Sequence, residues 1–366
     1  MNHVSSNDAC QLHEEARLPM VESRGHYFVA VDINDSQRLL GVDTSAERTI
    51  LSADTADALN LPADTSKAEN LVNVGERMKP VYPRVVASLK LGPAEWSNLT
   101  VPTVESLLPS PHTPTPVAGV LGANILSRYD VELDFPAGTM TLYSAQNCAG
   151  RFAPWHGDYQ AYSPEYTKRH RFIVSVALNG HPMRAVLDTG ATHSLVSRAA
   201  ALDAGVDEAE LARDRTVSGT GLNGNSIGVH IHRFEQFRVG SRAYDNIVLE
   251  VGDTQLSTDM LLGMDFMKWR RVWLSYSTGW VFTQLASLRA DGGLVEPHSV
   301  SGPGRALDAG AELAAIPHAA STPDALPLDR LREFSSHSHI TYYRSQRLIE
   351  APRMPSGGYK PGDTFP

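Results

Sequence analysis

The sequence has no apolar run long enough to cross a bilayer as a helix. Its opening, MNHVSSNDACQLHEEARLPM, also lacks the apolar core of a secretory signal peptide. No membrane span is therefore predicted. The location is cytoplasmic if this opening is native, and an exported location requires that a leader has been removed.

A basic stripe is missing as well. Asp and Glu total 41 against 32 Lys and Arg, which gives a formal net charge of -9. Binding to nucleic acid depends on cations that displace counterions from phosphates, so the sequence predicts no nucleic-acid partner. Apolar residues at 42% and charged residues at 20% are ordinary for a folded protein, and 366 residues favour two domains with tails.

Cysteine is scarce, with only Cys10 and Cys148 in the chain. The two would pair in an oxidising compartment and stay as free thiols in a reducing one. Their spacing alone does not decide between these states.

Several catalytic and cofactor motifs are absent. The sequence contains no Gly-x-Ser-x-Gly elbow and no zincin helix, so serine and metallo hydrolases have no support. The run Gly219-x-Gly221-x-x-Gly224 matches a dinucleotide fingerprint, but the following NSIGVHIHRF is typical of a strand rather than the required helix. His230 and His232 are too few ligands for a metal site and are interpreted as solvated surface residues. No cofactor and no metal are predicted.

The chain repeats itself. FVAVDINDSQRLLGVDTSAERTIL, from Phe28, and FIVSVALNGHPMRAVLDTGATHSLV, from Phe172, each have alternating apolar residues, a polar turn and an apolar run into Asp-Thr. LGANILSRYDVELDFPAGTMTLY, from Leu121, and LGMDFMKWRRVWLSYSTGWVFTQ, from Leu262, match without a gap, and each ends in a hairpin pattern. An internal duplication with two lobes follows.

Strand patterns dominate both copies, so the predicted fold is all-β with a few short helices, at TADALNL and RAAALDAG. Residues beyond about 285 are rich in Gly, Pro, Ser and Ala without a sustained period, apart from a short helical pattern at LDRLREF. The predicted domains are an N-terminal extension (1–22), a first lobe (23–150), a linker (151–170), a second lobe (171–286) and a low-complexity, disordered tail (287–366).

AVLDTGATHSLVS, with LLGMDF downstream, resembles the retropepsin-like aspartic proteases. The resemblance implies two acid-protease β-barrel lobes related by a pseudo-twofold axis and a catalytic pair of Asp43 and Asp188. Two close carboxylates share a proton and divide into base and acid, which predicts a bell-shaped, acidic or mildly acidic pH profile. The residues expected to support the catalytic loops are Thr44, Ser45, Ala46, Thr189, Gly190 and Ala191. Those expected to brace these loops from beneath are Leu121, Gly122, Leu262 and Gly263.

The first copy departs from the motif at one position, because GVDTSAERTIL has Ser45 where the second copy has Gly190. A side chain there could crowd the carboxylates or the scissile peptide. Two functions therefore stay open: an aspartic endopeptidase, and a catalytically impaired module that binds an extended peptide by β-type pairing.

The resemblance also implies where a polypeptide substrate would lie. A covering hairpin is expected at VSGTGLNG, with Gly219, Thr220 and Gly221 near the substrate, and a counterpart is expected at VNVGERM. Subsites are expected at Glu47 and Arg48 in one lobe and at Thr192 and His193 in the other. Their different charges predict an asymmetric cleavage preference.

More narrowly, the arrangement is similar to bacterial two-domain retropepsin-like proteins, many of which are exported. That similarity favours a periplasmic or envelope location if a leader has been removed, where a Cys10–Cys148 bridge would hold the extension against the first lobe. Because one chain carries both half-sites, homodimerisation is not required.

Overall fold

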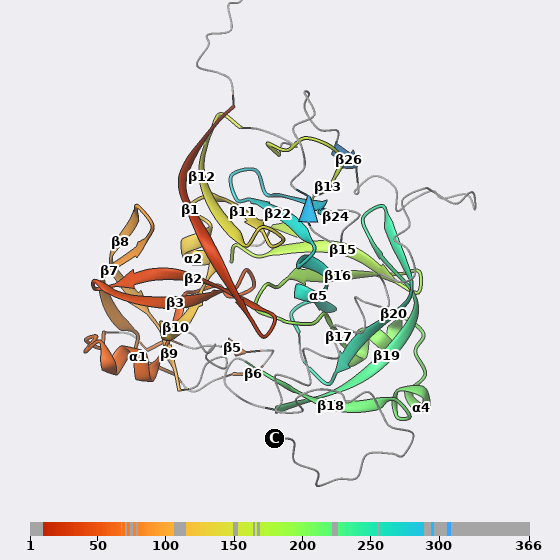
Figure 1. Cartoon of the computed structure of the whole chain (residues 1–366). Helices are drawn as coiled ribbons and strands as arrows, with labels where there is room; N and C mark the ends of the chain where they lie inside the picture. Colours follow the sequence, from red (N-terminus) through yellow and green to blue (C-terminus); the bar gives the residue numbers. More distant parts are fainter. Residues whose placement is uncertain are drawn as a thin grey trace, which may run out of the picture.

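The computed structural model describes residues 10–66, 68–69, 72–73, 76–77, 80–105, 115–148, 153–163, 165–166, 169–221, 226–254, 256–288, 294–295 and 306–308. Two β-rich lobes lie side by side, and a shared sheet joins them along one edge (Figure 1). Within the described residues, no helix is long and apolar enough to span a membrane.

The elements of the first half are β1 (Gln11–Ser23), β2 (His26–Ile33), β3 (Ser36–Val42), β4 (Ile50–Ser52), α1 (Ala53–Ala58), β5 (Val72–Asn73), β6 (Glu76–Arg77), β7 (Arg84–Leu91), β8 (Ala94–Val101), β9 (Thr103–Val104), β10 (Val117–Leu121), α2 (Ala123–Leu126), β11 (Asp130–Asp134) and β12 (Thr139–Gln146).

Those of the second half are β13 (Tyr159–Tyr162), β14 (Glu165–Tyr166), β15 (Phe172–Leu178), β16 (His181–Leu187), β17 (Leu195–Ser197), α3 (Arg198–Asp203), α4 (Glu208–Leu211), β18 (Arg215–Thr220), β19 (Ser226–Val239), β20 (Arg242–Gly252), β21 (Met260–Leu262), α5 (Met264–Met267), β22 (Arg270–Ser275), β23 (Trp280–Leu285), β24 (Ser287–Leu288), β25 (Leu294–Val295) and β26 (Ala306–Asp308).

The two lobes use the same pairing order. In the first, β3 pairs parallel with β10, β10 antiparallel with β4, and β4 parallel with β9. In the second, β16 pairs parallel with β21, β21 antiparallel with β17, and β17 parallel with β20. The all-β class and the duplicated organisation predicted from the sequence are confirmed.

Each lobe opens with a tight hairpin. Asn34 and Asp35 join β2 to β3 with φ of 50° and 60°, and Asn179 and Gly180 join β15 to β16 with φ of 49° and 82°. Positive φ at both central residues is the geometry that matches strand twist in two-residue hairpins, and Asn, Asp and Gly tolerate it best.

Both predicted helices are present, each beginning after a serine N-cap. Ser52 Oγ accepts a hydrogen bond from the Thr55 amide at 3.0 Å at the start of α1, and Ser197 Oγ accepts one from the Ala200 amide at 3.2 Å at the start of α3. The helix predicted at LDRLREF lies outside the described residues.

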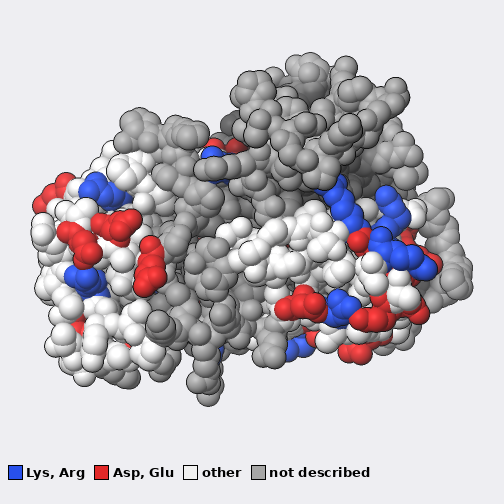
Figure 2. Space-filling view, turned by 90° about the horizontal axis from the view of Figure 1, so that it is seen from below, with Lys and Arg blue, Asp and Glu red and all other residues white. Residues whose placement is uncertain are grey.

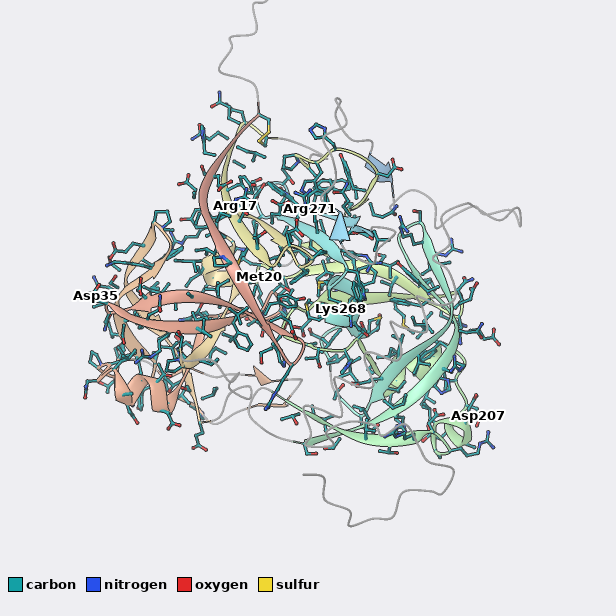
Figure 3. The ribbon with its side chains drawn as sticks, viewed as in Figure 1. Arg17, Met20, Asp35, Asp207, Lys268 and Arg271 are labelled. Carbon is teal, nitrogen blue, oxygen red and sulfur yellow. A yellow bond between two sulfur atoms is a disulfide. The ribbon has the colours of Figure 1, made fainter. Side chains whose placement is uncertain are left out.

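The shared sheet joins the lobes through their last hairpins. β11 pairs antiparallel with β22, so that Val131 faces Leu274 and Leu133 faces Val272. Next to this contact, Glu132 accepts hydrogen bonds from Trp155 Nε1 at 2.8 Å and from Arg271 Nε at 3.0 Å. Arg271 is labelled on this sheet in Figure 3. A polar contact at Glu132 and an apolar seam therefore hold the lobes together along this sheet.

Three segments outside the predicted lobes contribute strands to this sheet, and one of them, the predicted tail, supplies β26, which pairs with β13. The predicted linker supplies β13, which pairs with β23, and the predicted extension supplies β1, which pairs with β12 and then with β2. Ala16, Leu18 and Met20 are buried at alternate positions of β1. A disulfide between Cys10 and Cys148 closes the outer end of the β1–β12 ladder, where Figure 3 shows its yellow bond. Nearly all of the predicted tail lies outside the described residues.

Candidate active site

Two equivalent loops follow two buried strands. Asp43 comes directly after β3 and Asp188 directly after β16. Their backbone amides donate to the carbonyls of Leu121, at 3.1 Å, and Leu262, at 3.0 Å, at the ends of β10 and β21. Each aspartate is therefore fixed to the end of a neighbouring parallel strand.

Gly122 and Gly263, which directly follow β10 and β21, allow the loop after each aspartate to pass close to the end of these strands. A Cβ at Gly122 would lie 2.4 Å from the carbonyl carbon of Arg48, and a Cβ at Gly263 would lie 2.6 Å from that of His193. Both distances are shorter than any non-bonded contact allows. The chain then turns into α2 and α5, with the Ala123 amide donating to the Ala46 carbonyl at 2.8 Å.

Side chains that the sequence interpretation missed complete this support. Thr49 Oγ1 accepts from the Gly122 amide at 3.1 Å, and Asn124 Oδ1 accepts from the Thr49 amide at 2.6 Å. In the second lobe, Ser194 Oγ accepts from the Gly263 amide at 2.9 Å and donates to Asp265 Oδ1 at 2.7 Å. The aligned repeats already placed Thr49 opposite Ser194 and Asn124 opposite Asp265, so this signal was present in the sequence.

The two loops are tied to each other by their threonines. Thr44 Oγ1 donates to the Leu187 carbonyl at 2.7 Å and accepts from the Thr189 amide at 3.2 Å. Thr189 Oγ1 donates to the Val42 carbonyl at 2.7 Å and accepts from the Thr44 amide at 3.0 Å. Both threonines are 1% exposed. Four hydrogen bonds thus join the lobes at the aspartates.

The arrangement brings the two carboxylates to one point. A Cβ built on Gly190 would lie 2.7 Å from Asp43 Cγ and 3.1 Å from Asp188 Oδ1, so both acids face this glycine. Asp188 Oδ1 accepts from the amides of Gly190, at 2.9 Å, and Ala191, at 3.1 Å. Asp43 Oδ1 accepts from the Ser45 amide, the Ser45 hydroxyl and the Ala46 amide, each at 2.9 Å.

Burial governs the ionisation of this pair. Asp43 and Asp188 are 8% and 6% exposed, and burial raises the pKa of both carboxyls. For Asp188 the charge of Asp43 adds to this effect, and its pKa rises to about 7. The hydrogen bonds to each carboxylate act in the opposite direction. One proton therefore remains on the pair at mildly acidic pH.

The residues next to the loops occupy different environments. Glu47 pairs with Arg169 at 2.8 Å and Arg171 at 3.6 Å, which lie at the entry to the second lobe. Arg48 pairs with Glu69 at 3.1 Å and donates to the Thr100 carbonyl at 2.8 Å.

In the second lobe His193 is turned inward. It is 7% exposed, and its Nδ1 lies 3.2 Å from Thr192 Oγ1 and 3.3 Å from Glu250 Oε1. Burial, with the nearby Asp265, raises the pKa of Glu250 to about 8. Glu250 therefore keeps its proton at neutral pH, and its contact with His193 is then not a pair of opposite charges.

A hairpin is present at each expected covering position. β18 and β19 pair from Arg215–Ile231 to Thr220–Ser226, which includes Gly219 and Thr220 and leads to Gly221. The short strands β5 and β6 pair Val72 with Arg77. Both hairpins lie on the opposite side of the molecule from the shared sheet (Figure 1).

One histidine assignment from the sequence is wrong. His232, predicted to be solvated, is 4% exposed, and its Nδ1 lies 2.6 Å from Asp214 Oδ2. The pair lies near the start of the β18–β19 hairpin, because Asp214 directly precedes β18. An alternating strand pattern cannot tell a buried, paired histidine from a solvated one. No cluster of three metal-ligand residues occurs within the described part of the chain.

The face seen in Figure 2 carries acidic and basic side chains close together on both flanks of its described surface. Such intermixed charge differs from the single-sign stripe that binding to a polyanion requires.

Comparison with known proteins agrees with the duplicated loops. The family model described as "Aspartyl protease" matches twice, over residues 29–125 and 174–266, which together make up more than half of the chain. The chain belongs to the aspartyl protease family. Each match contains one Asp-Thr loop and the glycine that braces it, so the two family domains correspond to the two lobes.

Among solved structures, a retropepsin-like aspartic protease from Rickettsia conorii is similar to this family member. It shares 19% sequence identity, with a TM-score of 0.25, over 38% of this chain and 96% of the other. No curated protein matches the chain.

The threonine contacts between the loops generate a prediction. Thr44→Val keeps the shape of the side chain but leaves the Leu187 carbonyl and the Thr189 amide without their partner. We expect a loss of about 1–3 kcal/mol in the free energy of unfolding, measured by denaturant titration. Thr44→Val with Thr189→Val should cost less than the sum of the single changes, because the residues share one network.

Thr216→Val, on an exposed position of β18, is the matched control and should change stability by less than about 0.5 kcal/mol. Equal effects of Thr44→Val and Thr216→Val would contradict the inferred role of the loop contacts.

Proposed function

We propose that this protein is an aspartic endopeptidase in which Asp43 and Asp188 activate a water molecule to hydrolyse a peptide bond. The observation that carries the proposal is the convergence of the two buried carboxylates on Gly190, with each loop held by the threonine of the other. Family membership supports the same reaction class.

The chemistry follows from one shared proton. The ionised carboxylate takes a proton from water as the water oxygen attacks the carbonyl carbon, and the protonated carboxylate gives its proton to the carbonyl oxygen. The tetrahedral intermediate then collapses. The C–N bond breaks as one hydroxyl of the intermediate returns its proton to the ionised carboxylate and the nitrogen receives a proton from the protonated one, and a new carboxyl and a new amine leave.

The substrate proposed is a polypeptide in an extended conformation, covered by the β18–β19 and β5–β6 hairpins. Gly219, Thr220 and Gly221 would approach it from the second lobe. Glu47 and Arg48 would line one end of the site and Thr192 the other, whereas His193 is too buried to offer more than support to its loop. Both aspartates belong to one chain, so the proposal requires no second copy.

A peptide-binding module without catalysis is the second candidate. The observation that favours it is the Ser45 side chain, which occupies the position of the motif glycine and contacts the Asp43 carboxylate at 2.9 Å. Such a module would hold a peptide between the hairpins and leave it uncut.

Digestion of a denatured protein mixture between about pH 4 and 9 separates the two candidates. We expect the wild type to cleave with a bell-shaped pH profile that falls as the pH rises through about 7, because Asp188 then loses the proton that it must donate. Asp43→Asn and Asp188→Asn should each abolish cleavage, with products read by mass spectrometry.

Asp35→Asn, in the exposed β2–β3 turn, is the matched control and should leave cleavage unchanged. Activity that survives Asp43→Asn or Asp188→Asn would contradict the dyad. A wild type that binds peptides without cutting them would favour the peptide-binding module.

The unequal charges beside the loops generate a separate prediction. Glu47→Gln and Arg48→Met should alter residue preference on one side of the scissile bond, and Thr192→Val should alter it on the other. The expected change is about two- to five-fold, the size of a partly screened charge interaction. A peptide-library profile that none of the three variants changes would contradict the asymmetric site.

A further inference from the structure

The two catalytic loops differ in the number of donors that they supply. Asp188 Oδ1 accepts two backbone hydrogen bonds, from Gly190 and Ala191. Asp43 Oδ1 accepts the equivalent two, from Ser45 and Ala46, and a third from the Ser45 hydroxyl. The replacement of glycine by serine is the source of this third donor.

Only one of the two loops has room for a side chain at this position. A Cβ on Gly190 would lie 2.7 Å from both Cγ and Oδ2 of Asp43, with backbone behind it that is fixed by the threonine contacts. On the other loop the Ser45 side chain is accommodated, and its hydroxyl makes a hydrogen bond of normal length. The serine therefore lies in the loop that has room for a small polar group beside the carboxylates.

The hydroxyl also determines which hydrogen bonds are compatible. The structure shows the Ser45 hydroxyl donating to Asp43 Oδ1 at 2.9 Å. A serine hydroxyl has one proton to donate and lone pairs to accept with. Because it donates to Asp43, it has no proton left to donate to Asp188.

We propose that Ser45 is a positioning residue that keeps the negative charge on Asp43 and the shared proton on Asp188. The inference rests on the proposed function, because it assigns the base to Asp43 and the acid to Asp188. The Ser45 hydroxyl donates to the Asp43 carboxylate and stabilises its charge, and the shared proton then stays on Asp188. Ser45 then makes the two carboxyls unequal, with the charge on Asp43 and the proton on Asp188, and does not obstruct them.

The electrostatics of the site agree with this direction. Burial and the charge of Asp43 raise the pKa of Asp188 to about 7. Burial also raises the pKa of Asp43, and hydrogen bonds oppose the rise at both carboxyls, but only for Asp188 does the charge of the other acid raise the pKa further. The groups that act on this pair are thus the two acids themselves and the donors of the two loops.

Carbon-13 NMR of protein labelled at the aspartate carboxyl carbons tests the assignment without substrate. Asp43→Asn and Asp188→Asn identify the two signals. In the wild type we expect Asp43 to ionise first, at a lower pH than Asp188. Ser45→Ala should raise the pKa of Asp43 by about one to two units, the effect of removing one hydrogen bond to a charged group.

Ser45→Gly distinguishes the hydroxyl from the volume of the side chain. Both Ser45→Ala and Ser45→Gly remove the hydroxyl, and only Ser45→Gly also removes the Cβ. The proposal expects the same shift in both variants, and the acidic limb of kcat/KM should move upward by the same amount. Ser45→Gly also restores the motif glycine, so it tests the proposal even if Ser45→Ala fails to fold.

An Asp43 pKa that is unchanged in both variants would overturn the inference, as would a wild type in which Asp188 ionises first. These outcomes are separable from failure of the proposed function. A protein that shows the expected titrations but cuts no peptide retains the Ser45 inference and loses the endopeptidase. A protein that cuts peptides with titrations insensitive to Ser45 loses only the inference.

Discussion

The reciprocal hydrogen bonds of Thr44 and Thr189 are the interaction on which the rest of this structure depends. Each threonine side chain reaches the backbone of the opposite lobe twice, and both are buried. Buried polar groups of this kind cost free energy when they lose their partners, so the two loops are held together in one arrangement. The convergence of the two aspartates follows from that arrangement.

The same contacts explain why two acids can lie so close in a buried place. Each carboxylate accepts backbone hydrogen bonds from its own loop, and each loop is braced by a glycine that no larger residue could replace. These donors offset part of the cost of burial, but not all of it, and the pair retains a proton. Burial of the two carboxyls thus costs stability, and the same burial leaves the pair with the proton that acid–base chemistry would use.

Much of the fold and of the candidate site was predictable because the same sequence pattern occurs twice in the chain. The hairpins after Phe28 and Phe172, the helices after Ser52 and Ser197 and the loop glycines at 122 and 263 depend on local chemistry that occurs twice. β1 and β13 were not predicted as parts of the core, because their partners lie far away in sequence and their single copies have no repeat to support them. Ion pairs such as Glu47 with Arg169 depend on the packing of the lobes, which a linear pattern does not encode.

Ser45, which replaces the motif glycine, is another residue whose contacts could not be predicted from the sequence. The sequence identified Ser45 as a departure from the motif, and steric reasoning alone interpreted it as an obstruction. In the structure its hydroxyl donates to Asp43, so its effect is on the distribution of the shared proton rather than on the room left for a substrate.

Difference titration tests most directly the claim that two lobes build one proton-sharing pair. Protons released between about pH 3 and 8 by the wild type would be compared with those released by the Asp43→Asn, Asp188→Asn double variant. The account predicts two additional protons in the wild type, released in two well-separated steps, the second near pH 7. Release of both protons together near pH 4, as from two independent aspartates, would contradict it.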